Sequence, residues 1–189
     1  TFMKNRKPGS RIIGGIFKGT NIPFKPSKEL RPTENRTRET LFNWLMLDIA
    51  DAVCLDMFSG TGALGFEALS RGAKEVVFIE KSKLLCESIS KVIHKLSLEN
   101  RTTVINSDSI KYSYKDMESK FNVLFLDPPF RESLLYSAYT TCLIKNILKE
   151  DALIYVESET GNAYEFDKWK EIKSSKAGQT QFSLFTNEA

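Results

Sequence analysis

Short apolar runs alternate with segments of helical periodicity along most of this 189-residue chain. Each apolar run has the length of a buried strand and ends in polar or glycine-containing sequence. The runs lie at residues 52–55, 76–79, 102–105, 121–126 and 152–156. Helical periodicity covers residues 34–47, 66–70, 82–98 and 132–148. This alternation predicts an α/β fold, with a mostly parallel sheet and helices on both of its faces.

The last part of the chain departs from this alternation. Residues 169–175 and 180–185 are both strand-like, and they flank Gly178. Two strand-like segments around a glycine predict a terminal antiparallel hairpin. The chain contains no internal repeat and no low-complexity segment. The division that the sequence suggests is a small N-terminal extension over residues 1–40 and a main domain over residues 41–189.

An acidic residue stands at the end of four successive predicted strands. These residues are Asp56, Glu80, Asp108 and Asp127. The carboxyl ends of parallel strands share one edge of a sheet, and ligands of open α/β sheets bind beyond that edge. Four acids at such positions are hard to explain as solvated surface alone. The sequence therefore predicts a ligand site at this edge.

A glycine-rich loop follows the first of these strands. Gly60, Gly62 and Gly65 form a G-x-G-x-x-G pattern at a strand-to-helix turn. Glycines there allow a tight turn and a close approach of the backbone to a ligand, and the helix N-terminus favours an anionic group. Glu80 follows Gly60 by about twenty residues, where a ribose-binding carboxylate belongs. Two cofactor classes fit, a nicotinamide or flavin dinucleotide and S-adenosylmethionine.

Asp56 favours the second cofactor class. A carboxylate just before the glycine loop would repel the pyrophosphate of a dinucleotide. S-adenosylmethionine instead carries an ammonium for such an acid and a carboxylate for the N–H groups of the loop. The alternative is that Asp56 caps a helix or stabilises the turn.

The tetrapeptide Asp127-Pro128-Pro129-Phe130 ends the strand at 121–126. Two prolines prevent the strand from continuing. An exocyclic amino group of a nucleobase presents two N–H donors, and the Asp127 carboxylate and the Pro128 carbonyl are two acceptors for them. Phe130 would stack on the base and fix the direction of attack. The alternative is a proline-terminated strand that leads into a helix N-terminus.

The net charge of +3 is unevenly distributed. Residues 1–40 contain ten basic and three acidic residues, a charge of +7, which leaves −4 for the rest of the chain. Such a basic segment suggests a polyanionic partner, most simply nucleic acid, although a basic tail can also be merely solubilising. Residues 11–19 look like a strand and a turn with apolar positions that need a packing surface, which favours nucleic acid. Arg36 and Arg38 are expected to point outward near the start of their helix.

The sequence gives little support for a disulfide, a metal site or a histidine-dependent active site. Cys54, Cys86 and Cys142 lie far apart in apolar stretches, as core thiols of a reducing cytoplasm do. His94 is the single histidine, and clustered ligands are missing from the sequence, so neither a metal site nor a histidine-dependent triad is expected. We expect a cytoplasmic protein without a membrane partner, because no apolar run reaches a spanning length and no signal-peptide pattern opens the chain.

Six motifs together resemble a known family. They are RIIGG at 11–15, LRPT at 30–33, RETLFNWL at 38–45, the glycine loop and helix at 56–71, DPPF at 127–130 and ALIYVESE at 152–159. With them the chain resembles the class I S-adenosylmethionine-dependent methyltransferases, and closely the RsmD-type guanine-N2 methyltransferases of bacterial small-subunit (16S) ribosomal RNA. The resemblance covers nearly the whole chain. It implies a Rossmann-like fold with a seven-stranded, mostly parallel sheet and a terminal antiparallel hairpin.

The resemblance also implies a role for each part of the site. The methionine part of S-adenosylmethionine would contact Asp56, Phe58, Gly60 and Gly62, the ribose Glu80, and the adenine Asp108 and Ser109. The catalytic residues would be Asp127, Pro128 and Phe130. RNA would contact Arg11, Lys18, Arg31, Thr33, Arg36 and Arg38. Lys81 and Ser82 depart from the acidic variant associated with the family after the glutamate.

The function implied is methyl transfer to the N2 amino group of a guanine in small-subunit ribosomal RNA, in an assembled or assembling subunit. The enzyme would act as a monomer. A DNA adenine-N6 methyltransferase is an alternative, because the tetrapeptide suits either amino group, but the chain has little room for a DNA target-recognition region. A catalytically silent RNA-binding protein of ribosome assembly is a second alternative. A dinucleotide oxidoreductase leaves the proline pair unexplained.

Overall fold

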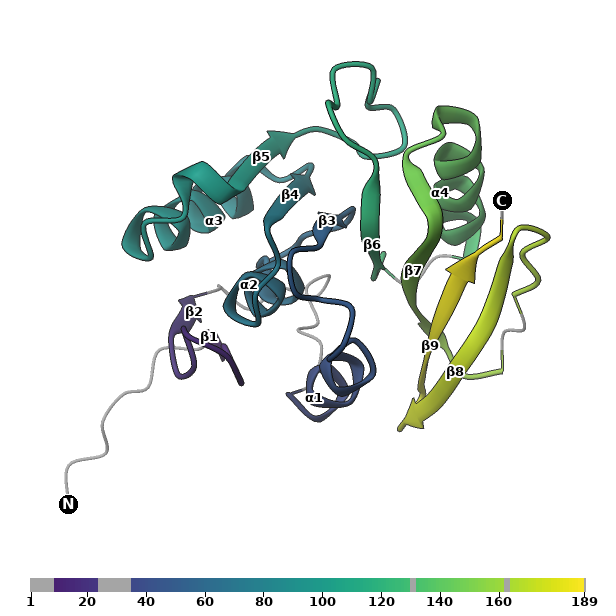
Figure 1. The fold of residues 1–189 in the computed structure, drawn as a ribbon, viewed down its shortest axis with the longest axis horizontal. Helices are drawn as coiled ribbons and strands as arrows, with labels where there is room; N and C mark the ends of the chain where they lie inside the picture. Colours follow the sequence, from purple (N-terminus) through teal and green to yellow (C-terminus); the bar gives the residue numbers. More distant parts are fainter. Residues whose placement is uncertain (1–8, 24–34, 130–131, 162–163, 189) are drawn as a thin grey trace.

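The computed structural model describes residues 9–23, 35–129, 132–161 and 164–188 (Figure 1). Its centre is a seven-stranded sheet with the strand order β5-β4-β3-β6-β7-β9-β8. The strands are β3 (Val53–Asp56), β4 (Glu75–Glu80), β5 (Thr102–Asn106), β6 (Phe121–Leu126), β7 (Leu148–Glu159), β8 (Trp169–Ala177) and β9 (Thr180–Asn187). The first five are parallel, and β9 pairs antiparallel with both β7 and β8. The predicted α/β fold, its parallel sheet and its terminal hairpin are therefore confirmed.

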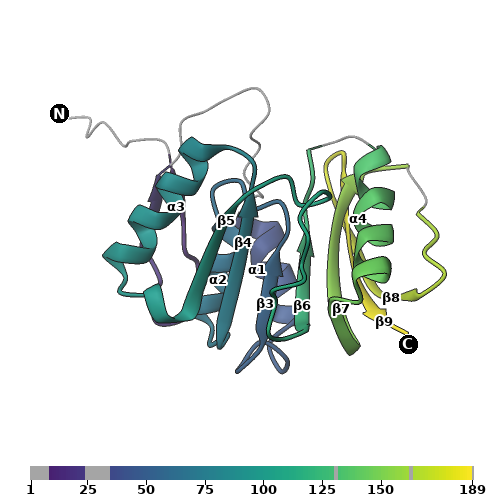
Figure 2. The same ribbon diagram turned by 90° about the horizontal axis from the view of Figure 1, so that it is seen from above.

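Helices cover both faces of this sheet (Figure 2). The described helices are α1 (Asn35–Trp44), α2 (Ala63–Ser70), α3 (Lys83–Lys95) and α4 (Glu132–Lys145), with a short 3-10 turn at Glu99–Arg101. Successive side chains of a strand point to opposite faces, so each strand contributes to two cores. One core joins the sheet to α1, α2 and α3, and the other joins it to α4. None of the described helices is long and apolar enough to cross a membrane.

Neighbouring elements explain where the helices depart from their predicted limits. The helix predicted at 34–47 is observed as Asn35–Trp44, because its last residues form turns before β3. The helix predicted at 132–148 stops at Lys145, since Leu148 already begins β7. The three cysteines are free and buried, as expected of core thiols.

The N-terminal segment packs onto the main core. β1 (Gly9–Arg11) and β2 (Asn21–Pro23) form a two-stranded antiparallel sheet beside α2 (Figure 1). Ile12 and Ile22 from this hairpin are both only 1% exposed, and they belong to the same core as α1 and α2. The boundary expected at residue 40 falls inside α1. The described part of the extension is thus built into the fold of the main domain.

A fully buried carboxylate holds the hairpin against α2. Glu67 accepts hydrogen bonds from the backbone N–H of Ile13 at 2.9 Å and of Gly14 at 2.8 Å. Arg71, the C-cap residue of α2, donates to the same carboxylate at 2.9 Å, and an Arg38 nitrogen lies 3.7 Å from it. We call Arg38, Glu67 and Arg71 the Glu67 cluster. It connects the hairpin, α1 and α2 through one negative charge.

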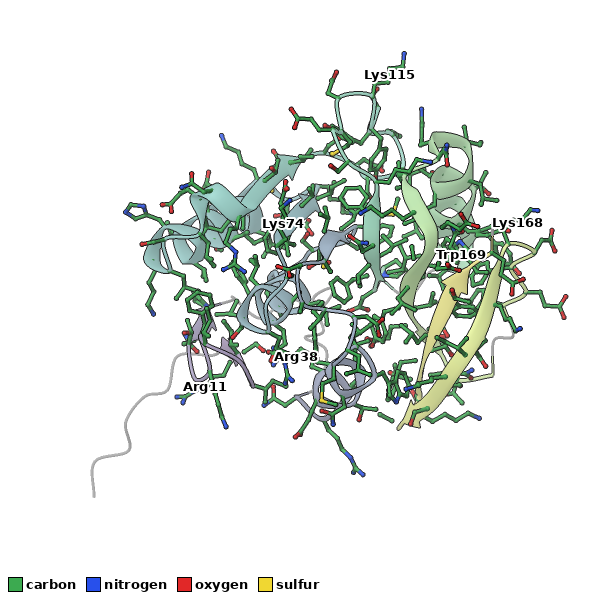
Figure 3. The ribbon with its side chains drawn as sticks, viewed as in Figure 1. Arg11, Arg38, Lys74, Lys115, Lys168 and Trp169 are labelled. Atoms are coloured by element: carbon green, nitrogen blue, oxygen red, sulfur yellow. The ribbon has the colours of Figure 1, made fainter. Side chains whose placement is uncertain are left out.

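The expectation that Arg38 points outward is wrong. Its side chain is 0% exposed and lies in the interior, whereas Arg11 is at the periphery (Figure 3). One Arg38 nitrogen donates to the Ser10 hydroxyl at 2.7 Å and to the Arg11 carbonyl at 2.9 Å. Burial lowers the pKa of Arg38, and the charge of Glu67 opposes that shift. An arginine used in this way ties α1 to the hairpin and is not available to a phosphate.

Removal of the Glu67 carboxylate should strongly destabilise the protein. Glu67→Ala leaves the buried Arg38 charge uncompensated and two backbone N–H groups without acceptors, so we expect a loss of about 3–5 kcal/mol in the free energy of unfolding. Arg71 is partly exposed, and Arg71→Ala should cost only about 1 kcal/mol. Urea unfolding of the two variants measures both values. Equal losses for the two variants would contradict the central role of Glu67.

Candidate active site

The four strand-end acids lie along one edge of the sheet. β3 is the central strand, between β4 and β6, and β5 pairs with the far side of β4. All four strands are parallel, so their carboxyl ends share one edge. Asp56 and Glu80 are the last residues of β3 and β4, and Asp108 and Asp127 come just after β5 and β6. The chain runs from β3 outward to β5 and then returns to β6 on the other side of β3. Ligands of open α/β sheets bind at such a switch point.

The loop after β3 is held from both sides. The N–H of Met57 donates to the Phe125 carbonyl at 3.2 Å, and that of Ser59 donates to the Ile79 carbonyl at 3.0 Å. Gly62 has a φ of 81°, in the left-handed region that favours glycine, and it precedes the first turn of α2. A Cβ atom at Gly65 would collide with the Phe78 ring, so a glycine there lets α2 approach β4 closely. The glycines thus fix a tight turn that ends at a helix N-terminus.

Glu80 connects this loop to the start of α3. Its two carboxylate oxygens accept hydrogen bonds from the N–H of Gly60 and from that of Ser82, each at 2.8 Å. The side chain is partly exposed at the end of β4. Because both bonds use backbone donors, the carboxylate has a fixed orientation beside the loop. This is the position that the sequence assigns to a ribose-binding acid, and the ribose contact itself stays a prediction.

Asp56 is buried beneath the loop, with 2% of its surface exposed. Its carboxylate accepts a hydrogen bond at 3.2 Å from the N–H of Gly65, in the first turn of α2. Gly62, at the N-cap position, provides no side-chain cap, so Asp56 caps the helix from a distance. Burial raises the pKa of Asp56 to about 7, while the Gly65 hydrogen bond opposes the shift and the negative charge of Glu80 adds to it.

The acid at the end of β5 lies in a turn. Asp108 is exposed, and its carboxylate accepts the N–H of Ile110 at 2.9 Å. Ser109 is buried, and its carbonyl accepts the Tyr114 hydroxyl at 2.9 Å. The N–H of Ser107 donates to the Glu80 carbonyl at 3.1 Å, which brings this turn next to the end of β4. Asp108 and Ser109 are thus adjacent to the residue predicted to hold the ribose.

The proline pair follows β6, directly beside β3. Asp127 is partly exposed, Pro128 is buried and Pro129 is exposed. Phe58, from the glycine loop, is partly buried and packs against the core on the α4 side. The fold therefore brings the tetrapeptide and the glycine loop to adjacent strand ends. Phe130, the predicted stacking residue, lies outside the described residues.

Three of the predicted RNA-binding residues are exposed on the N-terminal part of the chain. They are Arg11 in β1, Lys18 in the turn after it, and Arg36 in the first turn of α1. Arg38 is buried, as described above. Arg31 and Thr33 lie outside the described residues. The exposed cations occupy the hairpin and the start of α1, two elements that the Glu67 cluster joins.

Sequence reasoning missed two groups near the site. Glu67 lies within the motif at 56–71, but no role was assigned to it from the sequence. An acid inside the apolar helix sequence ALGFEALS is nevertheless a signal for a buried partner. Tyr155 and Glu157 on β7 were likewise part of a motif without a role. The Tyr155 hydroxyl donates to the Glu157 carboxylate at 2.8 Å. The alternation of β7 places both residues on one face, but their proximity to the end of β6 follows only from the pairing of β6 with β7.

Comparisons with known proteins agree with this fold. A family model described as Conserved hypothetical protein 95 matches residues 10–186. Ribosomal RNA small subunit methyltransferase D of Haemophilus influenzae is 40% identical over 97% of this chain and 96% of its own length. The Escherichia coli K12 protein of the same name is 40% identical over 95% of this chain and 90% of its own length. The solved structure of the Escherichia coli protein yhhF has a TM-score of 0.87 and 38% identity, over 96% of this chain and 99% of that one.

The parallel sheet, the glycine loop and these relatives define a class I, Rossmann-like methyltransferase. Within that class, the matches over nearly the whole chain place it in one family. The chain belongs to the family of ribosomal RNA small subunit methyltransferase D, as its motifs suggested.

The buried Asp56 carboxylate should make stability depend on pH. Its pKa is raised in the folded chain, so ionisation costs stability; the cost is absent below about pH 4, grows between about pH 4 and 7, and is complete above pH 7. Asp56→Asn cannot ionise and keeps an oxygen for the Gly65 N–H. Relative to the unmodified protein, it should gain about 2–4 kcal/mol of unfolding free energy between pH 4 and pH 8.

Urea unfolding across this pH range measures that gain. The exposed Asp48 offers a matched control, because Asp48→Asn removes a carboxylate of the same type from the surface. A difference between Asp56→Asn and the unmodified protein that stays constant from pH 4 to pH 8 would contradict the burial of an ionisable Asp56.

Proposed function

We propose that this protein transfers a methyl group from S-adenosylmethionine to the N2 amino group of a guanine in small-subunit ribosomal RNA. The observation that carries the proposal is the position of Asp127 and the proline pair, at the strand end next to the glycine loop. A cofactor over the loop and a base amino group at Asp127 would then be neighbours. The names of the relatives support ribosomal RNA over DNA as the substrate.

The residues of the loop fit S-adenosylmethionine. Its amino-acid part carries an ammonium and a carboxylate, and the site pairs a buried acid, Asp56, with the N-terminus of α2. Glu80, fixed by two backbone donors, is suited to ribose hydroxyls, and Asp108 with Ser109 to the adenine edge. Phe58, Gly60 and Gly62 complete the cofactor contacts that we propose. When bound, S-adenosylmethionine supplies an electrophilic methyl group.

The protein's own contribution at the reacting atom is orientation. A guanine amino group is conjugated with its ring and is a weak nucleophile. The Asp127 carboxylate and the Pro128 carbonyl would accept hydrogen bonds from its two N–H groups. These bonds would hold the nitrogen in line for attack. No strong base is needed before attack, because the methylated nitrogen is far more acidic and its proton leaves afterwards. Phe130 would stack on the base, which must be unpaired or flipped out.

The substrate that we propose is an assembled or assembling small subunit in the cytoplasm, with the protein acting as a monomer. The exposed Arg11, Lys18 and Arg36 would contact RNA phosphates, together with Arg31 and Thr33. Residues 1–40 would thus form the RNA-binding extension of a methyltransferase domain at residues 41–189. Arg38 has no phosphate contact in this proposal, since it is buried in the Glu67 cluster.

Replacement of Asp127 tests the transfer mechanism. We expect Asp127→Ala to lower methyl transfer by about 100-fold or more, because the amino group loses one of its two acceptors, and to change S-adenosylmethionine affinity by less than about twofold. The assay combines labelled S-adenosylmethionine with small-subunit particles, free ribosomal RNA or duplex DNA and identifies the methylated nucleoside. Asp116→Ala, at an exposed acid before β6, is the matched control. Full activity in Asp127→Ala would refute the mechanism, and N6-methyladenine in DNA would refute the substrate.

Replacement of the exposed cations tests the RNA surface. Arg11→Ala, Lys18→Ala and Arg36→Ala should each raise KM for the RNA substrate, leave kcat nearly unchanged, and reduce the slope of log affinity against log salt by about 1. Lys168 lies at the other end of the molecule from Arg11 (Figure 3), so Lys168→Ala should change none of these values. If Lys168→Ala had the same effect as the three variants above, RNA would bind by general charge attraction instead of at a defined surface.

A further inference from the structure

A buried tyrosine on β7, the strand that pairs with β6, is hydrogen-bonded to a second carboxylate. Tyr155 is 0% exposed on β7, in the core beneath α1, and its hydroxyl donates to Glu157 at 2.8 Å. Burial raises the pKa of Tyr155, and the negative charges of Glu157 and then Asp127 raise it further. The hydroxyl is thus hydrogen-bonded to Glu157 and lies within range of the charge of Asp127. Tyr155 therefore stays protonated and donates its single proton to Glu157.

The pairing of β6 with β7 explains this proximity. Phe125 is the partner of Tyr155, and Leu126 is the partner of Val156. The paired positions end there, and Asp127 and Glu157 are one position further along their respective chains. Phe125 and Tyr155 lie in the same core, and side chains two residues further along a strand point to the same face. Adjacent strands are about 5 Å apart, so we expect the two carboxylates to be lateral neighbours at the site edge.

A second carboxylate beside Asp127 distinguishes guanine from adenine. The amino group of guanine has N1–H, a donor, on one side and N3, an acceptor, on the other. The amino group of adenine has acceptors on both sides, N1 and N7. A carboxylate can only accept hydrogen bonds, so it attracts the N1–H of guanine and repels N1 of adenine. Asp127 alone accepts from either amino group and makes no such distinction.

We infer that Glu157 accepts the N1–H of the target guanine and makes the enzyme specific for guanine, with Tyr155 as the residue that positions Glu157. The inference rests on the proposed function, since it presumes that a base amino group is bound at Asp127. Glu157 is partly exposed, and one of its oxygens accepts from Tyr155. A carboxylate has about four acceptor sites on two oxygens, so it can accept from both groups at once.

A base analogue tests this role directly. 2-Aminopurine keeps the amino group of guanine but has an unprotonated N1, which accepts instead of donating. Once the methylated nucleotide is mapped, small-subunit particles are prepared with guanine or 2-aminopurine at that position. The unmodified protein should favour guanine in kcat/KM by roughly 10- to 100-fold, the effect of one hydrogen bond to a charged group. Glu157→Gln presents either an oxygen or an NH₂, so its preference should fall below about threefold.

Two further variants separate specificity from folding. Glu159→Gln changes an exposed acid on the same strand and should keep the full guanine preference. Tyr155→Phe removes the hydroxyl that orients Glu157 and should reduce the preference to an intermediate value. All three variants should bind S-adenosylmethionine with unchanged affinity. Damage to the fold would lower transfer to both bases. A gain in transfer to 2-aminopurine by Glu157→Gln therefore cannot result from such damage.

The outcomes distinguish this inference from the proposed function. If the unmodified protein makes N2-methylguanosine but Glu157→Gln keeps its preference for guanine, the role of Glu157 is refuted and the proposed function stands. The same conclusion follows if the unmodified protein uses guanine and 2-aminopurine equally. If the unmodified protein makes no N2-methylguanosine from any ribosomal substrate, the proposed function fails, and the inference fails with it.

Discussion

The geometry of the site depends on backbone N–H groups that carboxylates hold. Asp56 accepts from Gly65 below the loop, and Glu80 accepts from Gly60 and Ser82 beside it. A loop that must expose its amides to a ligand cannot use them all in regular secondary structure. Side-chain acceptors fix such a loop without using up its other N–H groups. Both acids therefore support the shape of the site, whatever they contact in a bound cofactor.

A carboxylate that accepts backbone N–H groups also holds the N-terminal hairpin. Glu67 accepts two N–H groups of the hairpin from within α2, the helix whose N-terminus borders the glycine loop. A surface for RNA on the hairpin would thus have a fixed distance to the cofactor loop. The buried charges of Arg38 and Glu67 stabilise this connection, because buried charges are costly to separate from their partners.

The fold was largely predictable from the sequence, and the site only in part. Apolar runs, glycines and prolines mark strand ends locally, so the edge that contains Asp56, Glu80, Asp108 and Asp127 followed from the pattern. The burial of Arg38 did not follow, because it depends on Glu67, 29 positions later in the chain. An arginine near a helix start looks exposed unless its distant partner is known. The Tyr155–Glu157 pair was missed for the same reason, since its importance comes from the register of β6 and β7.

The charge distribution has a consequence for how RNA would approach. The sheet edge carries acids, whereas Arg11, Lys18 and Arg36 lie exposed on the hairpin and the start of α1. Phosphates are attracted to the second surface and repelled by the first. Nucleobases are uncharged, and the guanine edge presents donors that carboxylates accept. The backbone would therefore stay on the basic surface while a single base enters the acidic edge. Such an arrangement favours a flipped-out or unpaired base over a stacked one. Only an extruded base can present its hydrogen-bond donors to the acidic edge while its phosphate stays on the basic surface.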